Sequence, residues 1–281
     1  MTDRSFFMRA IIDTHSHLYE LTDASAVLRD CADAGVSDIV ALGVDLSSNK
    51  KHLELGLTLD ARRWTGPSNV QHPASNDLKI HLAFGLHPGN ITTSADTEAC
   101  FVFMREHVKE AVAIGETGLD YWYKWVRKDE VKKREQQAVF DRHLALAREF
   151  GLPIVIHSRG AWRECLDLTV RAKIEKAEFH WYSGPEDVLK DILEAGFFVS
   201  FTPALSYSPE HRKAAELAPL ERVLIETDTP VPYAQVQGGE KIASTPKDVW
   251  RTLKLLSELK GMPEDQLLDT VNANARRFFG I

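Results

Sequence analysis

The chain has 281 residues, of which 44% are hydrophobic and 27% charged, a balance ordinary for a globular protein with a large core. Its formal net charge of −7 argues against a protein that coats nucleic acid through a basic surface, although local charges or metal ions could still meet such a substrate. No apolar run is long enough for a membrane span, no secretory leader is recognisable, and Cys31, Cys100 and Cys165 form no CxxC pair, so we expect a cytoplasmic protein with reduced thiols.

Short apolar runs that predict strands alternate with amphipathic stretches that predict helices along the whole chain. The predicted strands cover residues 10–18, 38–44, 81–88, 112–120, 153–159, 177–183, 197–203 and 223–230. Many of these runs are almost entirely apolar, which is typical of parallel strands covered on both faces. Eight strands, each followed by a helix, predict an α/β fold of the (β/α)8 TIM-barrel type.

Helix and loop signals agree with this pattern. Residues 130–150 carry apolar side chains at helical spacing, and Gly151 and Pro153 then supply a helix stop and a strand start. Residues 62–79, rich in Gly, Pro, Ser and Asn, predict a long surface loop. Because no linker composition divides the sequence, we expect a single domain over residues 1–281.

The positions of the polar residues separate a barrel from a doubly wound sheet, which would show the same alternation. Candidates for chemistry follow at least five of the predicted strands, spread over the whole chain. An open sheet binds its ligand at one switch point, whereas a barrel brings the end of every strand to one axis. The spread therefore favours a closed barrel with a site at the C-terminal ends of its strands.

The first predicted strand ends in Asp13, His15 and His17. Residues two apart on a strand point to the same face, so these side chains are expected to enter the barrel together. Two imidazoles near one strand end are a natural chelating pair. The same pattern also occurs by chance in strands that contain histidine.

Later strands each bring further candidates. Glu116 follows an apolar segment and is flanked by glycines, where a buried carboxylate needs a metal or a salt bridge. His157 and His180 also follow apolar strand residues, a position that suits a ligand or a hydrogen-bonded core histidine. Glu226 and Asp228 share a face of the last strand, where they would repel each other unless a positive charge lies beside them.

Taken together, these residues give a stronger signal than any one of them. Four histidines, a glutamate and an aspartate are expected at one end of one barrel, namely His15, His17, Glu116, His157, His180 and Asp228. Six such ligands suffice for two divalent ions, which in known sites lie about 3.5–4 Å apart and activate water. A nitrogen and oxygen donor set without thiolate favours zinc, manganese or magnesium.

In chain order the sequence contains IIDTHSHL, GLHPGN, AIGETGLDYW, LPIVIHSR, FHWYSG and VLIETDTP, spread from residue 11 to about residue 231. This set and order resemble the TatD family of the amidohydrolase superfamily, which comprises metal-dependent deoxyribonucleases and related hydrolases. The resemblance implies a distorted TIM barrel that cleaves the phosphodiester bonds of DNA, with single-stranded DNA as the expected substrate.

The resemblance also implies roles for individual residues. The two histidines of the first strand and Asp228 are expected to bind one metal, His157 and His180 the other, and Glu116 to bridge both. Glu116 and Asp228 are therefore the expected catalytic residues, with Asp228 accepting a proton from the attacking water. Residues 231–245 do not resemble the RGKRNEP-like loop of bacterial members, so the contribution of this loop stays open.

Two residues one step deeper in the barrel, Asp13 and Glu226, are candidates for orienting the ligand imidazoles, with ordinary buried hydrogen bonding as the alternative. Arg159, two residues after His157, is expected to contact a substrate phosphate, since guanidinium groups bind phosphate in a bidentate manner. His87, at the end of the third strand, is a further candidate for substrate contact.

Residues 121–128 interleave aromatic side chains with Lys and Arg, and Tyr121 and Trp122 are the candidates for substrate contact. Aromatic rings on which bases stack, combined with cations along the backbone, hold single strands without reading their sequence. The alternative is a hydrophobic lid that leads into the next helix.

Other functions fit parts of this pattern. The same site would serve a metal-dependent esterase, a deacylase or a small-molecule amidohydrolase, and a non-enzymatic barrel could act as a scaffold. We expect DNA as the partner and no membrane. The sequence decides neither the metal, nor endonuclease against exonuclease action, nor the oligomeric state.

Overall fold

The computed structural model describes residues 10–61, 78–234 and 239–281, so the loop predicted over 62–79 lies almost wholly outside the described residues. One eight-stranded parallel sheet runs in chain order, which confirms the predicted barrel. Its strands are β1 (Ile11–Ser16), β2 (Val36–Leu42), β3 (Lys79–Phe84), β4 (Ala111–Asp120), β5 (Ile154–Arg159), β6 (Ala177–Phe179), β7 (Phe198–Phe201) and β8 (Val223–Ile225). That residues 1–281 form a single domain stays a prediction.

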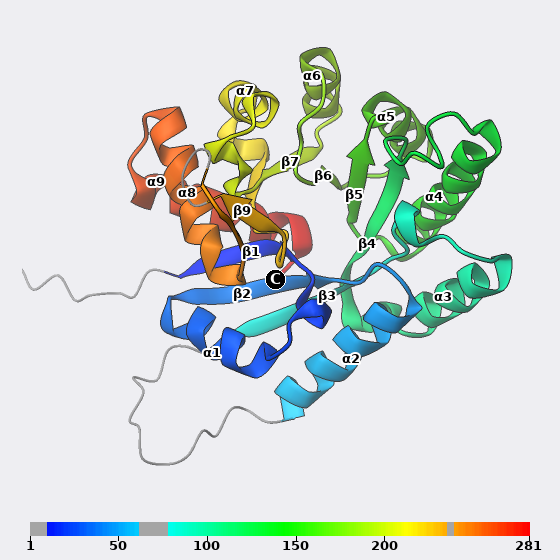
Figure 1. Cartoon of the computed structure of the whole chain (residues 1–281), viewed down its shortest axis with the longest axis horizontal. Helices are drawn as coiled ribbons and strands as arrows, with labels where there is room; N and C mark the ends of the chain where they lie inside the picture. The colour runs from blue at the N-terminus through cyan, green and yellow to red at the C-terminus, as the bar shows by residue number, and fades with distance from the viewer. Residues whose placement is uncertain (1–9, 62–77, 235–238) are drawn as a thin grey trace, which may run out of the picture.

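Helices form a ring around the strands (Figure 1). They are α1 (Ala24–Asp33), α2 (Leu46–Ala61), α3 (Ser94–Glu106), α4 (Glu130–Phe150), α5 (Trp162–Arg171), α6 (Glu186–Glu194), α7 (Pro209–Leu217), α8 (Val249–Lys260) and α9 (Glu264–Phe279). Asp129 caps the start of α4 by accepting from the backbone of Val131 and Lys132, and Gly151 ends it in the left-handed conformation. None of the described helices combines the length and apolarity that crossing a membrane requires, and a cytoplasmic location stays a prediction.

A short antiparallel hairpin interrupts the strand–helix alternation after β8. It consists of β9 (Pro232–Ala234) and β10 (Lys241–Ala243), and it precedes α8. The sequence pattern predicts no hairpin here, because each of its strands has only three residues. The last unit of the barrel therefore differs from the simple strand-then-helix order.

The barrel closes at the seam between β1 and the segment after β8. The amide of Asp228 donates to the carbonyl oxygen of His15 at 2.9 Å, and the amide of His17 donates to that of Thr229 at 2.8 Å. The carboxylate of Asp13 accepts from the amide and the hydroxyl of Thr227 at 2.9 and 2.7 Å. These bonds lie at the C-terminal ends of the strands, so the seam is joined where the candidate ligands lie.

The inside of the barrel is apolar at the opposite end. One buried cluster combines residues from seven strands with the last turn of α9, namely Ile12, Val40, Leu42, Ala83, Ala113, Val155, Phe198, Leu224, Ala275, Phe278 and Phe279. The two phenylalanines of α9 thus plug the barrel floor. The larger cluster packs the outer face of the strands against the helices. Polar chemistry is concentrated at the mouth, although the buried Glu178 of β6 pairs in register with Val155 and Phe198 of this cluster.

On two strands, β1 and β4, the inward and outward alternation of side chains is interrupted before the strand reaches the mouth. On β1, Ile12 points into the barrel, so strict alternation would send Thr14 inward, but the register shifts between Asp13 and Ser16 and His15 enters the site instead. On β4 the register shifts between Ile114 and Thr117. Gly115 and Gly118 there have φ values of +149° and +143°.

Gly118 gives a test of this packing. A Cβ added there would lie 2.0 Å from the carbonyl oxygen of His157, whereas a Cβ at Gly151, also at positive φ, would meet nothing within 4 Å. We expect Gly118→Ala to lower the free energy of unfolding by about 3 kcal/mol or more. Gly151→Ala is expected to lower it by about 1–2 kcal/mol. Urea unfolding followed by circular dichroism measures both, and equal losses would contradict the close approach of β4 and β5.

Candidate metal centre

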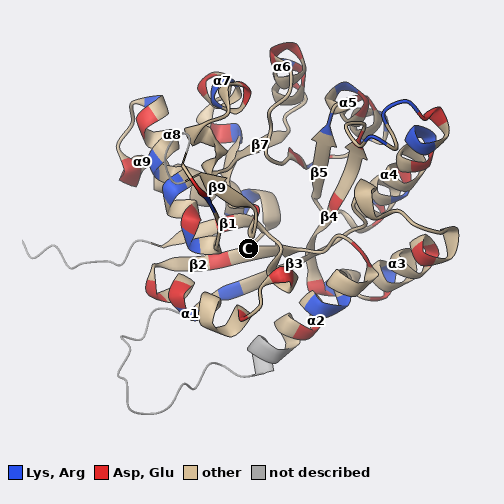
Figure 2. Cartoon of the chain, viewed as in Figure 1, with Lys and Arg blue, Asp and Glu red and all other residues tan. Residues whose placement is uncertain are grey.

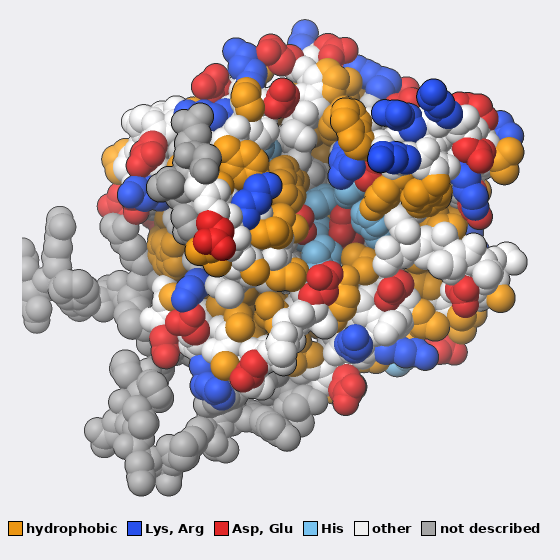
Figure 3. Space-filling view, in the orientation of Figure 1, with side chains coloured by type: hydrophobic (Ala, Val, Ile, Leu, Met, Phe, Trp, Pro, Cys, Tyr) orange, Lys and Arg blue, Asp and Glu red, His pale blue; other side chains and the backbone are white. Residues whose placement is uncertain are grey.

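The six predicted ligands meet at the mouth of the barrel. They come from the ends of strands β1, β4 and β5 and from the segments that follow β6 and β8. Glu116, His180 and Asp228 are buried, as are the two histidines of β1, and His157 is partly buried. Figure 3 shows histidine side chains at the bottom of a hollow on this face, with a red acidic side chain beside them.

The first set of donors surrounds one point. The Nε2 atoms of His15 and His17 lie 3.3 Å apart. Asp228 Oδ1 lies 3.6 Å from Nε2 of His15 and 3.2 Å from Nε2 of His17. Glu116 Oε2 lies 3.6 Å from the same atom of His15 and 3.3 Å from that of His17. With metal–ligand bonds of about 2.1 Å, the edges of a tetrahedron are about 3.4 Å. These four residues therefore have the spacing of a single metal site.

The second set lies on the other side of the same carboxylate. Glu116 Oε1 is 3.0 Å from His157 Nδ1 and 2.9 Å from His180 Nε2, and these two nitrogens are 3.4 Å apart. The Nε2 atom of His87 lies 3.6 Å from the same oxygen. Each oxygen of Glu116 thus faces a different group of imidazoles, which is the geometry of a bridging ligand.

Two of the remaining ring nitrogens have partners of their own. His17 Nδ1 lies 2.9 Å from the carbonyl oxygen of Leu42, and His157 Nε2 lies 3.1 Å from Asp120 Oδ2. Histidines that bind metals usually donate their second N–H to a carbonyl or a carboxylate, which fixes the ring and its tautomer. Asp120 was not among the residues predicted from the sequence. Its position on β4, four residues after Glu116 and so on the same face of a regular strand, could have indicated its place at the site.

Glu226 serves the other two imidazoles. Its Oε2 lies 3.7 Å from His15 Nδ1 and 3.6 Å from His180 Nδ1, and its Oε1 accepts from the Ser200 hydroxyl at 2.5 Å and from the Trp181 amide at 2.8 Å. This position agrees with the orienting role considered for Glu226. Asp13 differs, because its carboxylate is bonded to hydroxyl and amide groups at the seam and to no ligand imidazole.

The charges of the cluster favour a cation at its centre. Burial raises the pKa of the Glu116 carboxyl, but interactions with His87, with His180 and with the hydrogen-bonded His15 and His157 more than offset this and hold that pKa well below its usual value. Burial lowers the pKa of His17, but Asp228 and Glu116 raise it well above the ordinary value. In the protein alone, protons on the imidazoles compensate the carboxylates, and a divalent ion would supply the same charge.

Three buried polar atoms at this site have no hydrogen-bond partner within the described residues: His15 Nδ1, His180 Nδ1 and Glu226 Oε2. They face one another at 3.6–3.7 Å, so a small movement of the rings brings them into hydrogen bonds. The donor distances, the charges and the nitrogen and oxygen chemistry all fit a divalent metal.

The expected substrate residues lie around this centre in different environments. His87 is partly buried beside His157, with ring centroids 4.4 Å apart, and the Arg159 side chain is 50% exposed. Trp122 is 59% exposed. Tyr121 is only 8% exposed, and its hydroxyl accepts from Gln137 of α4 at 2.8 Å, so its packing does not favour the predicted substrate contact.

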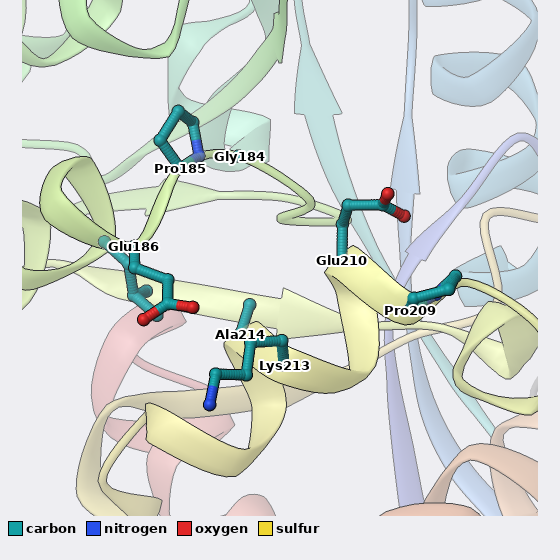
Figure 4. A pocket seen from close by; sticks show the side chains of 8 residues that line it. Gly184, Pro185, Glu186, Pro209, Glu210, Lys213 and Ala214 are labelled. Carbon is teal, nitrogen blue, oxygen red and sulfur yellow. The ribbon is translucent and has the colours of Figure 1, made fainter.

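A separate pocket of about 330 Å³ lies between α6 and α7, lined among others by Pro185, Pro209 and Lys213 (Figure 4). None of the predicted site residues lines it. The chemistry that the sequence indicates therefore belongs to the barrel mouth and not to this pocket.

The fold and the site define a metal-dependent hydrolase of the TIM-barrel type, with histidine and carboxylate ligands gathered at the strand ends. The sequence model of the family described as TatD related DNase matches residues 12–280. The chain belongs to this family.

Individual relatives agree with this membership. The chain is 30% identical to the uncharacterized metal-dependent hydrolase YcfH of Escherichia coli, over 96% of both chains. It is 26% identical to human deoxyribonuclease TATDN3, over 96% of this chain and 94% of that one. The crystal structure of the TatD homologue YjjV of Escherichia coli superposes with a TM-score of 0.79 at 24% identity, covering 96% of this chain and 98% of that one, which supports the fold.

Metal binding is expected to release protons. Removal from water lowers the pKa values of His17, His157 and His180, yet their carboxylate partners raise all three above the ordinary value. A metal must displace these protons, so its apparent affinity rises with pH, by up to about tenfold per pH unit for each proton released. Calorimetric titration in buffers of different ionisation enthalpy counts the protons. A heat that is independent of the buffer would contradict the expectation.

Glu226→Gln is expected to weaken metal binding by about 10- to 100-fold, because the amide cannot balance two ligand imidazoles as the carboxylate does. Asp13→Asn is the matched control: Asp13 is also a buried carboxyl at this end of the barrel, but it bonds to hydroxyl and amide groups and to no ligand ring. Competition with a fluorescent chelator measures both affinities. Equal losses in the two variants would show that Glu226 acts only through general stability.

Proposed function

We propose that this protein hydrolyses phosphodiester bonds of DNA, with two divalent ions held on either side of Glu116. The placement of the two Glu116 oxygens, each among a different set of imidazole nitrogens, carries the proposal. Membership in a family described as DNases and a human relative named as a deoxyribonuclease support DNA as the substrate. Zinc, manganese and magnesium all suit these donors.

The distances support the proposed ligand sets. His15, His17 and Asp228 would hold one ion, His157 and His180 would hold the other, and Glu116 would contribute one carboxylate oxygen to each. When bound, such a pair of ions supplies Lewis-acid stabilisation of the phosphate and makes the attacking water more acidic.

Asp228 is the residue that accepts the proton from the attacking water. It is 8% exposed and lies at the edge of the cluster, with a backbone φ of +50°. Burial raises the pKa of its carboxyl, but the hydrogen bond from His17 and the charges of the imidazoles lower it overall. The group is therefore an ionised acceptor at neutral pH, on the side of the site that solvent reaches.

His87 is a neutral hydrogen-bond donor to the substrate. Its Nδ1 accepts from the Gly89 amide at 2.9 Å, so the proton of the neutral ring lies on Nε2, the nitrogen that faces Glu116. Burial lowers the pKa of this imidazole to about 3, which keeps it neutral over the physiological range. A phosphate oxygen entering between Glu116 and the mouth would accept from this N–H. Arg159 adds a positive charge at the rim.

The Asp228→Asn variant tests the proposal on end-labelled single-stranded DNA. Chelator-treated wild-type protein should cleave after magnesium, manganese or zinc is restored, and the variant should be at least about 100-fold slower, since it lacks the proton acceptor. Asp129→Asn, which alters only the exposed cap of α4, is the control and should match the wild type. The length distribution of the products reports whether cleavage starts at an end.

Two results would overturn parts of this proposal. Undiminished cleavage by Asp228→Asn would remove Asp228 as the proton acceptor. Intact DNA with every metal, together with bound metal detected by elemental analysis, would remove DNA as the substrate. A panel of carboxylic esters, lactones and cyclic amides would then test the same site for hydrolysis of other bonds.

A further inference from the structure

The connection between β4 and α4, residues 121–128, is here called the aromatic loop. Its side chains divide into two groups: Tyr121 and Val126 are buried, whereas Trp122 and Trp125 are 59% and 46% exposed. The Tyr123 and Trp125 rings stack with centroids 5.4 Å apart and planes 20° from parallel. A hydrophobic lid would turn its rings inward. This loop is anchored by two side chains and presents two indoles to solvent.

The loop backbone is fixed by hydrogen bonds. The amides of Val126 and Arg127 both donate to the carbonyl oxygen of Tyr123, at 2.9 and 2.8 Å, and the amide of Asp129 donates to that of Val126 at 2.8 Å. Rings held on an ordered backbone lose little conformational entropy when a ligand stacks on them.

Positive charge surrounds the exposed rings. The Arg159 guanidinium lies 5.9 Å from the centroid of the Trp122 ring and 5.8 Å from that of Tyr123. Lys124, Arg127 and Lys128 are exposed, and no acidic residue occurs between positions 121 and 128. Figure 2 shows the Lys and Arg residues of this connection in blue. Figure 3 shows Lys and Arg side chains gathered above the hollow that holds the histidines. In a chain of net charge −7, this is a local concentration of positive charge.

The aromatic loop is tied to the metal centre through one carboxylate. Asp120 Oδ1 accepts from the Trp122 amide at 2.8 Å. Asp120 Oδ2 lies 3.1 Å from Nε2 of the ligand His157 and 3.7 Å from Nε of Arg159. The backbone at Trp122 is thus held by the same carboxylate that contacts the candidate ligand His157.

We propose that Trp122 stacks on an unpaired base of the DNA strand adjacent to the scissile phosphate, while Arg159 binds the neighbouring phosphate. This inference rests on the proposed function and makes Trp122 and Arg159 the residues that select single strands. A base in a duplex already has both faces covered by its neighbours, so only an unpaired base offers a free face to the indole. The exposed cations of the loop follow the backbone without reading sequence.

Binding gives the first test, without any cleavage. The anisotropy of fluorescein-labelled oligothymidylate is measured with chelator-treated wild-type protein and with Trp122→Ala. We expect the variant to bind about 5- to 150-fold more weakly, the loss of one stacked base. Trp122→Phe should recover part of the affinity. Binding of a blunt duplex should be nearly the same for wild type and variant.

Phe150→Ala is the matched control. Phe150 is an exposed aromatic residue at the far end of α4, and the Arg105 guanidinium lies over its ring at 5.6 Å, but it is not part of the aromatic loop. Its loss should leave the affinity for oligothymidylate unchanged. Equal effects of Phe150→Ala and Trp122→Ala, or an equal loss of duplex and single-strand binding in Trp122→Ala, would overturn the stacking role.

A walk with abasic residues gives the second test, with metal restored. A single abasic residue is moved along the oligonucleotide relative to the cut. Wild-type cleavage should fall at one position next to the cut, by about the same factor as the Trp122→Ala substitution on an intact strand. Trp122→Ala should be insensitive to an abasic residue at that position. Equal sensitivity of wild type and variant would overturn the inference.

The two proposals fail in different ways. If the wild type cleaves DNA and Trp122→Ala binds and cleaves normally, the stacking site is wrong and the hydrolase proposal stands. If oligothymidylate binds through Trp122 but no metal restores cleavage, the phosphodiesterase proposal is wrong and the stacking site stands.

Discussion

The structure depends on the burial of one carboxylate, that of Glu116. It is removed from water at the centre of a barrel, where an isolated charge would be strongly unfavourable. Imidazole nitrogens lie 2.9–3.6 Å from its oxygens on both sides, and these imidazoles are held in turn by Asp120, Glu226 and the carbonyl oxygen of Leu42. The polar mouth is therefore one connected system, in which the rings of His17 and His157 have acceptors behind them and Glu226 lies close to the rings of His15 and His180.

The backbone of the barrel is adjusted to this system. A strand with strict alternation would turn His15 and Glu116 away from the axis, given the inward positions of Ile12 and Ala113 below them. Register shifts on β1 and β4 correct the phase, and the positive φ values of Gly115 and Gly118 accompany the second shift. The apolar floor with Phe278 keeps regular packing, so irregular backbone occurs where the chemistry is.

Much of this could be predicted from the sequence. Apolar runs bounded by glycine and proline predict all eight strands, although several of the observed strands are shorter, as for residues 177–183 against Ala177–Phe179. That the candidate ligands lie together could be predicted because each follows an apolar run, and closure of the barrel brings such positions to one end; that they bind metal stays a prediction.

Other features could not be predicted, for physical reasons. The phase shifts depend on how neighbouring strands pair, so alternation assigned Asp13 to the interior, whereas it binds Thr227 at the seam. The role of Asp120 depends on a contact across β4 and β5. Composition gave Tyr121 and Trp122 the same expected role, but the turn of the loop buries one ring and exposes the other. Residue type determines chemical capacity, and only tertiary contacts determine which side chain is exposed.

The seam between β1 and β8 has a mechanical consequence. His15 and His17 belong to the first strand and Asp228 follows the last, so an ion held by them would cross-link the two ends of the barrel where only a few hydrogen bonds join them. Such a link closes a long loop that runs from His17 to Asp228, and the entropy it removes from the unfolded state grows with the length of that loop. A metal at this position would hold the two ends of the barrel together. Chelation would therefore first weaken the contacts between β1 and the segment after β8.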